Sequence, residues 1–255
     1  MKYLRFQKPD TNQWAWGIME NEPIVEELSN SYFDSLIKNG KSFDLSNIKL
    51  GLPTLPSKIV AVGLNYRDHI QEFGHQVPEN PILFIKPSTT ALETEGTIVL
   101  PPQSNQVDFE GELAIVIKQT AYHITVEEAP NYILGYTCFN DVTARDLQRI
   151  DGQWTRAKSF DTFAPLGPWI VPKINPNCLQ IITRVNGIIR QQSNTKHLVF
   201  PIYELVSYIS QIMTLLPGDV IATGTPSGVG PLYCGDRVDV EIEGIGILTN
   251  QARKL

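Results

Sequence analysis

Short β-branched runs, each bounded by Gly, Pro or Asn, restrict the fold of this 255-residue chain more than any other feature. Four such runs follow residue 57: Ile59–Val62, Ile82–Ile85, Thr97–Leu100 and Leu113–Ile117. Runs of four or five residues are the usual length of strands and are shorter than ordinary helices. Few helical patterns lie between them, and strands do not alternate with helices. The sequence therefore predicts a β-rich α+β fold rather than a doubly wound one.

Two further patterns strengthen the prediction of strands. Asn186-Gly187 lies between apolar runs, and Asn-Gly is the strongest short-range signal for a β-hairpin. Val238, Val240 and Ile242 alternate with acidic residues. That alternation predicts a strand with one buried face and one face in water.

Helical patterns are few. Thr125 and Glu128 have the spacing of a capping box, which predicts a short helix that begins there. Pro201 is expected to open a longer helix that ends at Pro217-Gly218. The apolar stripe of this helix is predicted to contain Ile202, Leu205, Val206, Ile209, Ile212 and Met213.

Residues 1–54 differ from the rest of the chain. They contain short alternating stretches followed by a polar segment, and prolines at positions 53 and 56 follow. Two prolines so close together are typical of a linker. We therefore predict a small β-rich N-terminal appendage, residues 1–54, and a main domain, residues 55–255.

Charge and composition limit the partners and the compartment. The formal net charge is −6, without a basic run that could neutralise phosphates, so nucleic acid is not an expected partner. The longest apolar runs are near five residues, as in Leu113–Ile117, far below the roughly 18 that span a bilayer. The first residues lack the apolar stretch of a signal peptide, and the three cysteines form no Cys-x-x-Cys pair. We expect a cytoplasmic protein that does not interact with membranes.

An acidic stretch, Asp108–Glu112, leads directly into the apolar run that ends at Ile117. The two-residue period of a strand places Glu110 and Glu112 on the same face. Two carboxylates so close repel each other unless they are solvated, protonated or joined by a cation. Either this is the solvated end of a strand, or it is a site for a hard cation such as Mg²⁺ or Mn²⁺.

A third acid follows the apolar segment 136–140. We predict that Asp141 begins a helix on which Asp141, Arg145 and Gln148 share one face, at spacings i, i+4 and i+7. Such a face could hold a metal together with a ligand that carries a carboxylate. The alternative is a surface ion pair between Asp141 and Arg145, worth only about 0.3–0.5 kcal/mol.

His69 and Glu72 are spaced i, i+3, so they are neighbours on a helical turn. A carboxylate beside an imidazole orients the ring and raises its basicity, which suits a general base near neutral pH. The alternative is an ordinary solvated pair. Four histidines without a His-x-x-x-His spacing make a zinc site improbable.

Two other segments could contact an anion. Lys158, flanked by aromatic and small residues, could face a negative ligand or could be a surface lysine. The segment 223–230 is rich in glycine, which lets backbone N–H groups approach an anion closely. It lacks the Gly-Lys-Ser/Thr of a P-loop, so a nucleotide site is excluded.

The order of these motifs resembles the fumarylacetoacetate hydrolase superfamily over about residues 55–255. The segments that carry the resemblance are Gly63–His69, Lys86–Ser88, Asp108–Ile117, Asn140–Gln148, Lys158–Asp161 and Thr223–Gly230. The resemblance implies a mixed β-sandwich roll with few helices, and a homodimer.

The resemblance also implies roles for single residues. It implies Mg²⁺ or Mn²⁺ held by Glu110, Glu112 and Asp141. In the subgroup of acylpyruvases, oxaloacetate decarboxylases and hydroxymuconate isomerases, His69 and Glu72 match a catalytic pair on a lid. The residues expected to face the substrate are Arg145, Gln148, Lys158 and Thr225, of which Lys158 would also stabilise an enolate.

These residues leave the reaction open. The leading hypothesis is metal-dependent hydrolysis of a C–C bond in a fumarylpyruvate-like or acylpyruvate-like 2-keto acid. The alternatives are isomerisation of a 5-carboxymethyl-2-hydroxymuconate-like acid, tautomerisation or decarboxylation of oxaloacetate, and non-catalytic binding of a metal or keto acid. Specificity is expected to depend on Phe73, Val77 and the N-terminal appendage.

Overall fold

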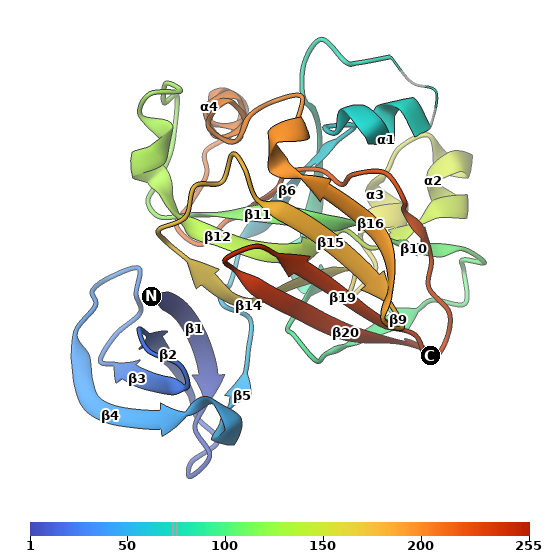
Figure 1. The fold of residues 1–255 in the computed structure, drawn as a ribbon. Coiled ribbons are helices and arrows are strands. Elements are labelled where there is room, and N and C mark those ends of the chain that lie inside the picture. Colours follow the sequence, from blue (N-terminus) through green and yellow to red (C-terminus); the bar gives the residue numbers. More distant parts are fainter. Residues whose placement is uncertain (73, 75) are drawn as a thin grey trace.

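The strands form three sheets in the computed structural model, which describes residues 1–72, 74 and 76–255. Phe73, one of the expected specificity residues, lies outside the described residues. The predicted β-rich α+β fold is confirmed, because the described residues form long sheets and only four α-helices. Figure 1 shows the N-terminal strands as a separate lobe beside the larger body.

The largest sheet has twelve strands and runs through both lobes. In spatial order its main path is β4 (Lys38–Asp44), β3 (Ile24–Leu28), β2 (Trp14–Met19), β1 (Lys2–Gln7), β14 (Ala164–Val171), β12 (Ile133–Asn140), β11 (Gly111–Ile117), β17 (Val220–Ala222), β6 (Lys58–Gly63) and β7 (Ile82–Pro87). Two short strands lie off this path: β5 (Lys49–Leu50) pairs with β1, and β8 (Ala91–Leu92) pairs with β14.

Two smaller sheets complete the body. The five-stranded sheet has the order β16 (Ile188–Asn194), β15 (Gln180–Val185), β19 (Arg237–Ile242), β20 (Gly246–Lys254) and β9 (Thr97–Leu100). The three-stranded sheet has the order β13 (Thr143–Ala144), β10 (Val107–Phe109) and β18 (Gly230–Pro231). The predicted Asn-Gly hairpin is confirmed, because β15 and β16 pair on either side of residues 186–187.

Strand β11 is buried on both faces, so its side chains belong to two different cores. Leu113 and Ile115 pack in a core that also contains residues of the five-stranded sheet and of α4 (Ile202–Ile212). Ala114 and Val116 pack in a core on the opposite face, which extends to Tyr3 of β1. This explains why the run is continuously apolar rather than alternating.

The N-terminal appendage is β-rich as predicted, and its sheet continues that of the body. Strand β1 pairs with β14 through Tyr3 and Ile170, and Tyr3 also stacks on Tyr32 with ring centroids 5.1 Å apart. The division at residue 54 stays a prediction.

Two predicted helices differ in their bounds. The capping box at residue 125 is present, since the Thr125 N–H donates to the Glu128 carboxylate at 2.8 Å. Only a turn and the 3₁₀ helix Ala129–Tyr132 follow it. Helix α4 ends at Ile212, well before Pro217, because Met213 is extended. The prediction that Ile212 belongs to the buried stripe is wrong, since its exposed fraction is 54%.

The prediction that Asp141 begins a helix is also wrong. Thr143 and Ala144 form strand β13, which pairs with β10, and this pairing keeps the backbone extended up to residue 144. Helix α2 therefore begins at Arg145 and runs to Asp151. Arg145 and Gln148 still share a helical face, whereas Asp141 lies in the link between β12 and β13.

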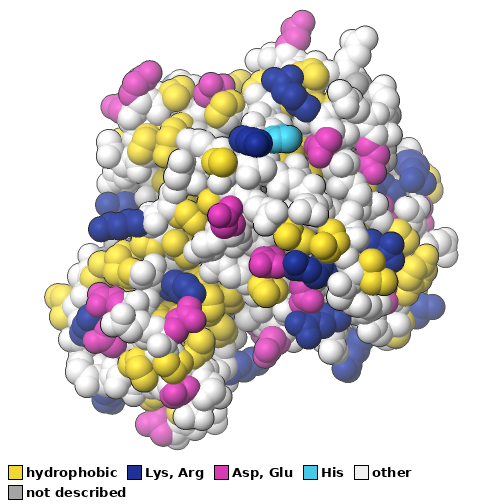
Figure 2. Space-filling view, viewed as in Figure 1, with side chains coloured by type: hydrophobic (Ala, Val, Ile, Leu, Met, Phe, Trp, Pro, Cys, Tyr) yellow, Lys and Arg dark blue, Asp and Glu magenta, His cyan; other side chains and the backbone are white. Residues whose placement is uncertain are grey.

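The remaining helices gather at one side of the body, where they surround one cavity. They are α1 (Arg67–Glu72), α2 and α3 (Thr155–Lys158), and Figure 1 shows them near one another. Short 3₁₀ helices occur at Leu45–Asn47, Ser88–Thr90 and Thr195–His197. None of the helices in the described part of the chain is long and apolar enough to span a membrane. On the face shown in Figure 2, basic and acidic side chains are intermixed.

Asp219, just before β17, hydrogen-bonds the segment at residues 57–58 that leads into β6. Its buried carboxylate accepts hydrogen bonds from the N–H and the hydroxyl of Ser57, at 3.0 and 2.6 Å. It also accepts from Lys58 Nζ at 2.5 Å and from the Leu216 N–H at 2.8 Å. We expect Asp219→Ala to lower the free energy of unfolding by about 1–3 kcal/mol, because the partly buried donors around this carboxylate would lose their shared acceptor. Denaturant unfolding would measure this, with the exposed Asp10→Ala as control. Equal stability of the two variants would contradict it.

Candidate active site

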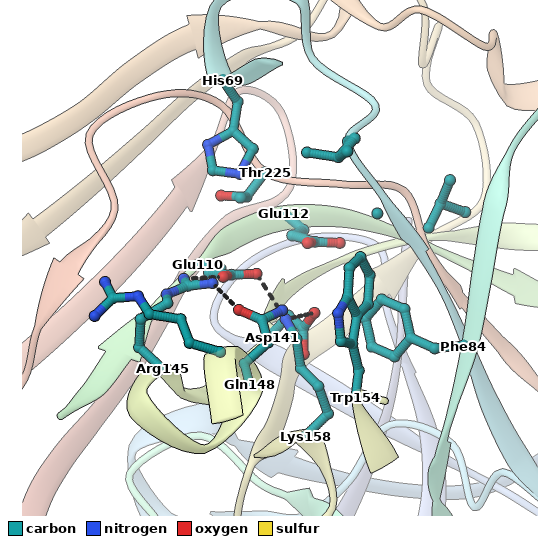
Figure 3. A pocket seen from close by; sticks show the side chains of 14 residues that line it. His69, Phe84, Glu110, Glu112, Asp141, Arg145, Gln148, Trp154, Lys158 and Thr225 are labelled. Atoms are coloured by element: carbon teal, nitrogen blue, oxygen red, sulfur yellow. Dashed lines mark hydrogen bonds and ion pairs between the residues drawn. The ribbon is translucent and has the colours of Figure 1, made fainter. Parts of the chain in front are cut away.

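One cavity of about 360 Å³ contains almost every predicted site residue (Figure 3). Its lining includes the predicted residues His69, Glu110, Glu112, Asp141, Arg145, Gln148, Lys158 and Thr225. Glu72 is the exception. It contacts His69 from outside the lining, and its side chain is 35% exposed.

The three predicted metal ligands meet because β11 and β12 are paired. Gly111 lies opposite Asn140 in this ladder, so the residues on either side of Gly111 lie near Asp141. The Asp141 N–H donates to the Glu110 carbonyl at 2.8 Å, which fixes the two chain segments together. One carboxylate oxygen from each of Glu110, Glu112 and Asp141 lies within 4.8 Å of the others, and all three residues are buried.

Three buried cations neutralise most of this negative charge. Lys158 Nζ lies between Glu110 and Asp141, at 2.9 and 2.6 Å. Arg145 donates from Nε to Asp108 at 2.8 Å and from Nη2 to Glu110. The predicted alternatives of a surface lysine at 158 and of a surface pair between Asp141 and Arg145 are therefore wrong.

Lys86 is the third buried cation, and the sequence analysis gave it no role. Its ammonium donates to Asp141 at 2.5 Å and to the Val142 carbonyl at 3.1 Å. Lys86 and Phe84 alternate with Ile85 on β7, and Ile85 is 45% exposed. The period of the strand could therefore have predicted that Lys86 faces the site together with Phe84.

The two glutamates of the acidic stretch have opposite pKa shifts. Burial raises the pKa of Glu110, but Lys158 and Arg145 outweigh it and hold this pKa below its ordinary value. Burial, together with the charges of Asp141 and Glu110, raises the pKa of Glu112 well above its ordinary value. Among the described residues, Glu112 is thus the one member of the triad without an ion pair to a cation. This donor set of three converging carboxylates fits a hard divalent cation.

The glycine-rich segment 223–228 contacts the protein's own carboxylates. The Gly224 N–H donates to Glu112 at 2.8 Å. Gly224 has φ +99°, and a Cβ there would lie 2.8 Å from the Asn65 Cβ, so only glycine fits without rearrangement. Thr225 donates to the Gly111 carbonyl at 2.9 Å and accepts from Gln191 at 2.8 Å. This segment therefore positions both a predicted metal ligand and a predicted substrate contact.

The same segment also holds the helix that carries the predicted base. Ser227 donates to Asp68 at 3.1 Å, and the Gly228 N–H donates to Glu72 at 3.2 Å. His69 Nδ1 lies 3.3 Å from Glu72 Oε2, as the i, i+3 spacing predicted. Burial lowers the pKa of His69, against the opposing charges of Glu110 and Glu72. A neutral imidazole at neutral pH can accept a proton.

An aromatic wall, which the sequence analysis did not identify, faces these charged groups. Phe84 and Trp154 pack edge to face with ring centroids 5.1 Å apart, and the Lys158 ammonium lies 5.0 Å from the Phe84 ring. Figure 3 shows this pair on the opposite side of the cavity from Arg145. The cavity therefore has one charged side and one apolar side, as expected for a small organic anion with a carbon chain.

Comparisons with known proteins agree with this geometry. Residues 58–253 match the family model described as fumarylacetoacetate (FAA) hydrolase, C-terminal. The mitochondrial oxaloacetate tautomerase Fahd2a of Rattus norvegicus is 46% identical over 209 residues, 78% of this chain and 67% of that protein.

Two solved structures are similar over the whole chain. A 5-carboxymethyl-2-hydroxymuconate delta-isomerase from Mycobacterium smegmatis is 44% identical with a TM-score of 0.94, and the match covers 100% of both chains. A fumarylacetoacetate hydrolase from Exiguobacterium antarcticum is 36% identical with a TM-score of 0.88, again over 100% of both chains.

The opposite pKa shifts of the two glutamates predict different consequences of neutralising each one. Glu112→Gln should weaken Mg²⁺ or Mn²⁺ binding by about 100-fold or more without destabilising the metal-free protein, because no ion pair joins Glu112 to a cation within the described part of the chain. Because folding raises the pKa of Glu112, the folded protein holds a proton on this carboxyl at pH values above 4.5, where the unfolded chain has lost it. Unfolding free energy should then fall as pH rises above that value, and Glu112→Gln should remove this fall.

Glu110→Gln should also abolish metal binding, but it should lower the free energy of unfolding of the metal-free protein by about 3–5 kcal/mol. The reason is that Arg145 and Lys158 would each lose a buried partner. Titration calorimetry with the metal and thermal unfolding of the chelator-treated protein would measure both effects, with Glu79→Gln as the exposed control. Equal destabilisation by the two substitutions would contradict the charge assignment.

Proposed function

The chain belongs to the fumarylacetoacetate hydrolase family, and we propose that it is a divalent-metal-dependent tautomerase that interconverts the enol and keto forms of a small 2-oxo acid. The observation that carries this proposal is the position of His69. Its imidazole lies buried in the cavity above the acidic triad, with Nδ1 against Glu72. The tautomerase and isomerase named above support this choice, because both reactions move a proton and leave the carbon skeleton intact.

We propose that Glu110, Glu112 and Asp141 hold Mg²⁺ or Mn²⁺. When bound there, such an ion supplies Lewis-acid stabilisation of negative charge on a substrate oxygen. The residues of the chain supply the proton transfer. With its Nδ1–H donated to Glu72, His69 keeps Nε2 as the nitrogen that accepts a proton. In the enol-to-keto direction His69 takes the proton from the enol hydroxyl and delivers it to the carbon next to the one that bears the hydroxyl. Atoms and charge therefore balance.

The other predicted contacts orient the substrate in this proposal. The Lys158 ammonium stabilises charge that develops on the oxygen, as preorganised cations do in a water-poor site. Gln148 accepts from Arg145 Nη1 at 2.6 Å, which turns its amide nitrogen away from Arg145 and makes that NH₂ a donor for a substrate oxygen. Thr225, fixed by Gly111 and Gln191, lies across the cavity from them.

Hydrolysis of a C–C bond is the second candidate, and the similarity to the fumarylacetoacetate hydrolase from Exiguobacterium antarcticum supports it. The same His69 would then take a proton from water.

The products of the reaction separate the two functions. A tautomerase converts enol-oxaloacetate to keto-oxaloacetate and leaves acetylpyruvate uncleaved, whereas a hydrolase splits acetylpyruvate into pyruvate and acetate. The decisive experiment is nuclear magnetic resonance of both reactions with Mg²⁺ or Mn²⁺. Stoichiometric pyruvate from acetylpyruvate would overturn the tautomerase proposal, and pyruvate and CO₂ from oxaloacetate would show a decarboxylase.

His69 provides the mutational test. His69→Asn should lower kcat by about 10²–10⁴-fold, because the general base is lost, while metal affinity stays within about twofold. Because burial lowers the pKa of His69, the acidic limb of the kcat/KM profile of the unmodified protein should lie below pH 6.5, its ordinary value. Stopped-flow absorbance of the enol would record both quantities. An acidic limb that persists unchanged in His69→Asn would show that another group is the base.

A further inference from the structure

The cations inside the cavity are already committed to carboxylates of the protein. Lys158 lies between Glu110 and Asp141, and Arg145 contacts both Asp108 and Glu110. Their positive charge is therefore balanced before an anionic substrate arrives. A substrate with two carboxylates needs a further positive group to balance its second charge.

Arg149 has the position and the charge for this. It lines the same cavity as the acidic triad, and it is exposed at the rim. Arg149 follows Arg145 by four residues on α2, so both side chains lie on the same face of the helix. This places a second guanidinium farther out on the charged side of the cavity.

No carboxylate lies within 4.0 Å of Arg149 among the described residues. Its hydrogen bond runs from Nη1 to the neutral Gln106 Oε1 at 3.4 Å, near the limit for such a bond. Arg156, seven residues after Arg149, differs from it in its ion pairing and in its position relative to the cavity. It forms an ion pair with Asp151 and does not line the cavity. Arg149 therefore keeps a guanidinium that can bind a carboxylate through two parallel hydrogen bonds.

The space between the triad and the rim suits a carbon chain. Phe84 and Trp154 form an apolar wall on the opposite side of the cavity from Arg145. The volume of about 360 Å³ exceeds what the three-carbon head of a 2-oxo acid would fill at the triad. The rest of the cavity leads along this wall.

We propose that Arg149 binds the distal carboxylate of the substrate, so that the preferred substrates are 2-oxo dicarboxylic acids and their enols rather than 2-oxo monocarboxylic acids. The reaction that these substrates undergo rests on the proposed function, whereas the binding of a carboxylate by Arg149 does not depend on it. The head of the acid lies at the triad, its chain follows the aromatic wall, and its second carboxylate reaches Arg149.

The test measures binding to the full-length protein loaded with Mg²⁺ or Mn²⁺, by calorimetry, using acids matched in length. The pairs are oxaloacetate with 2-oxobutanoate, 2-oxoglutarate with 2-oxopentanoate, and 2-oxoadipate with 2-oxohexanoate. Each pair differs only in whether the chain ends in a carboxylate or a methyl group. At one chain length at least, the unmodified protein should bind the diacid about tenfold or more tightly than the monoacid, with a preference that declines as salt is raised.

Arg149→Gln should remove this preference and leave the affinity for the monoacid within about twofold. Arg149→Lys should retain part of it, because it keeps the charge and loses the planar fork. Arg156→Gln is the matched control and should change nothing. A preference that survives in Arg149→Gln, or a preference for the monoacid at every length, would overturn the proposal.

A kinetic measurement separates this inference from the proposed function. If the protein is a tautomerase, Arg149→Gln should raise KM for enol-oxaloacetate about tenfold with kcat within about threefold. It should leave KM for tautomerisation of the enol of acetylpyruvate, a monocarboxylate, nearly unchanged. Loss of the diacid preference in binding, without any tautomerase activity, would refute the proposed function alone. Tautomerase activity with an unaltered KM in Arg149→Gln would refute the role of Arg149 alone.

Discussion

The burial of charge around the acidic triad is the constraint on which the rest of the site depends. Four carboxylates, of Asp108, Glu110, Glu112 and Asp141, are buried together with the three cations Lys86, Arg145 and Lys158. Buried charges are costly unless they are paired, and among the described residues no ion pair involves Glu112. The raised pKa of Glu112 is the direct result. The folded chain thereby prepares a place for a divalent cation, whose charge would complete the balance.

The sheet brings these groups to one place and buries them. The β11–β12 ladder sets Gly111 opposite Asn140, so Glu110 just before β11, Glu112 within β11 and Asp141 just after β12 converge. Strand β7 adds Lys86 from the other side of β6, and α2 and α3 add Arg145 and Lys158. Both faces of β11 are packed in apolar cores, and Glu110 and Glu112 at its start are buried.

The segment 223–228 links the metal ligands to the group that moves the proton. Gly224 donates to Glu112, and four residues later Gly228 donates to Glu72, which orients His69. The distance between the triad and the imidazole is thus set by one short piece of backbone. Such fixed geometry matters because a general base must lie within hydrogen-bond reach of the proton that it moves. The Phe84 and Trp154 rings form an apolar surface on the other side of the same cavity.

The sequence by itself determined the β-rich fold, many of the polar residues that line the cavity and the local pairing of His69 with Glu72, because strand period, turn residues and helical spacing act over a few neighbours. The resemblance carried by six ordered motifs added the metal triad, and the fold and the family are confirmed. Only the tertiary structure decided that Asp141 lies outside the helix, since the pairing of Thr143 with β10 overrides a local helical pattern. Only it decided that Lys158 is a buried ion-pair partner rather than a surface lysine, that Lys86 pairs with Asp141, and that no ion pair neutralises Glu112 within the described residues. A pKa depends on burial and on charges from distant parts of the chain, and neither is fixed until the sheets have packed.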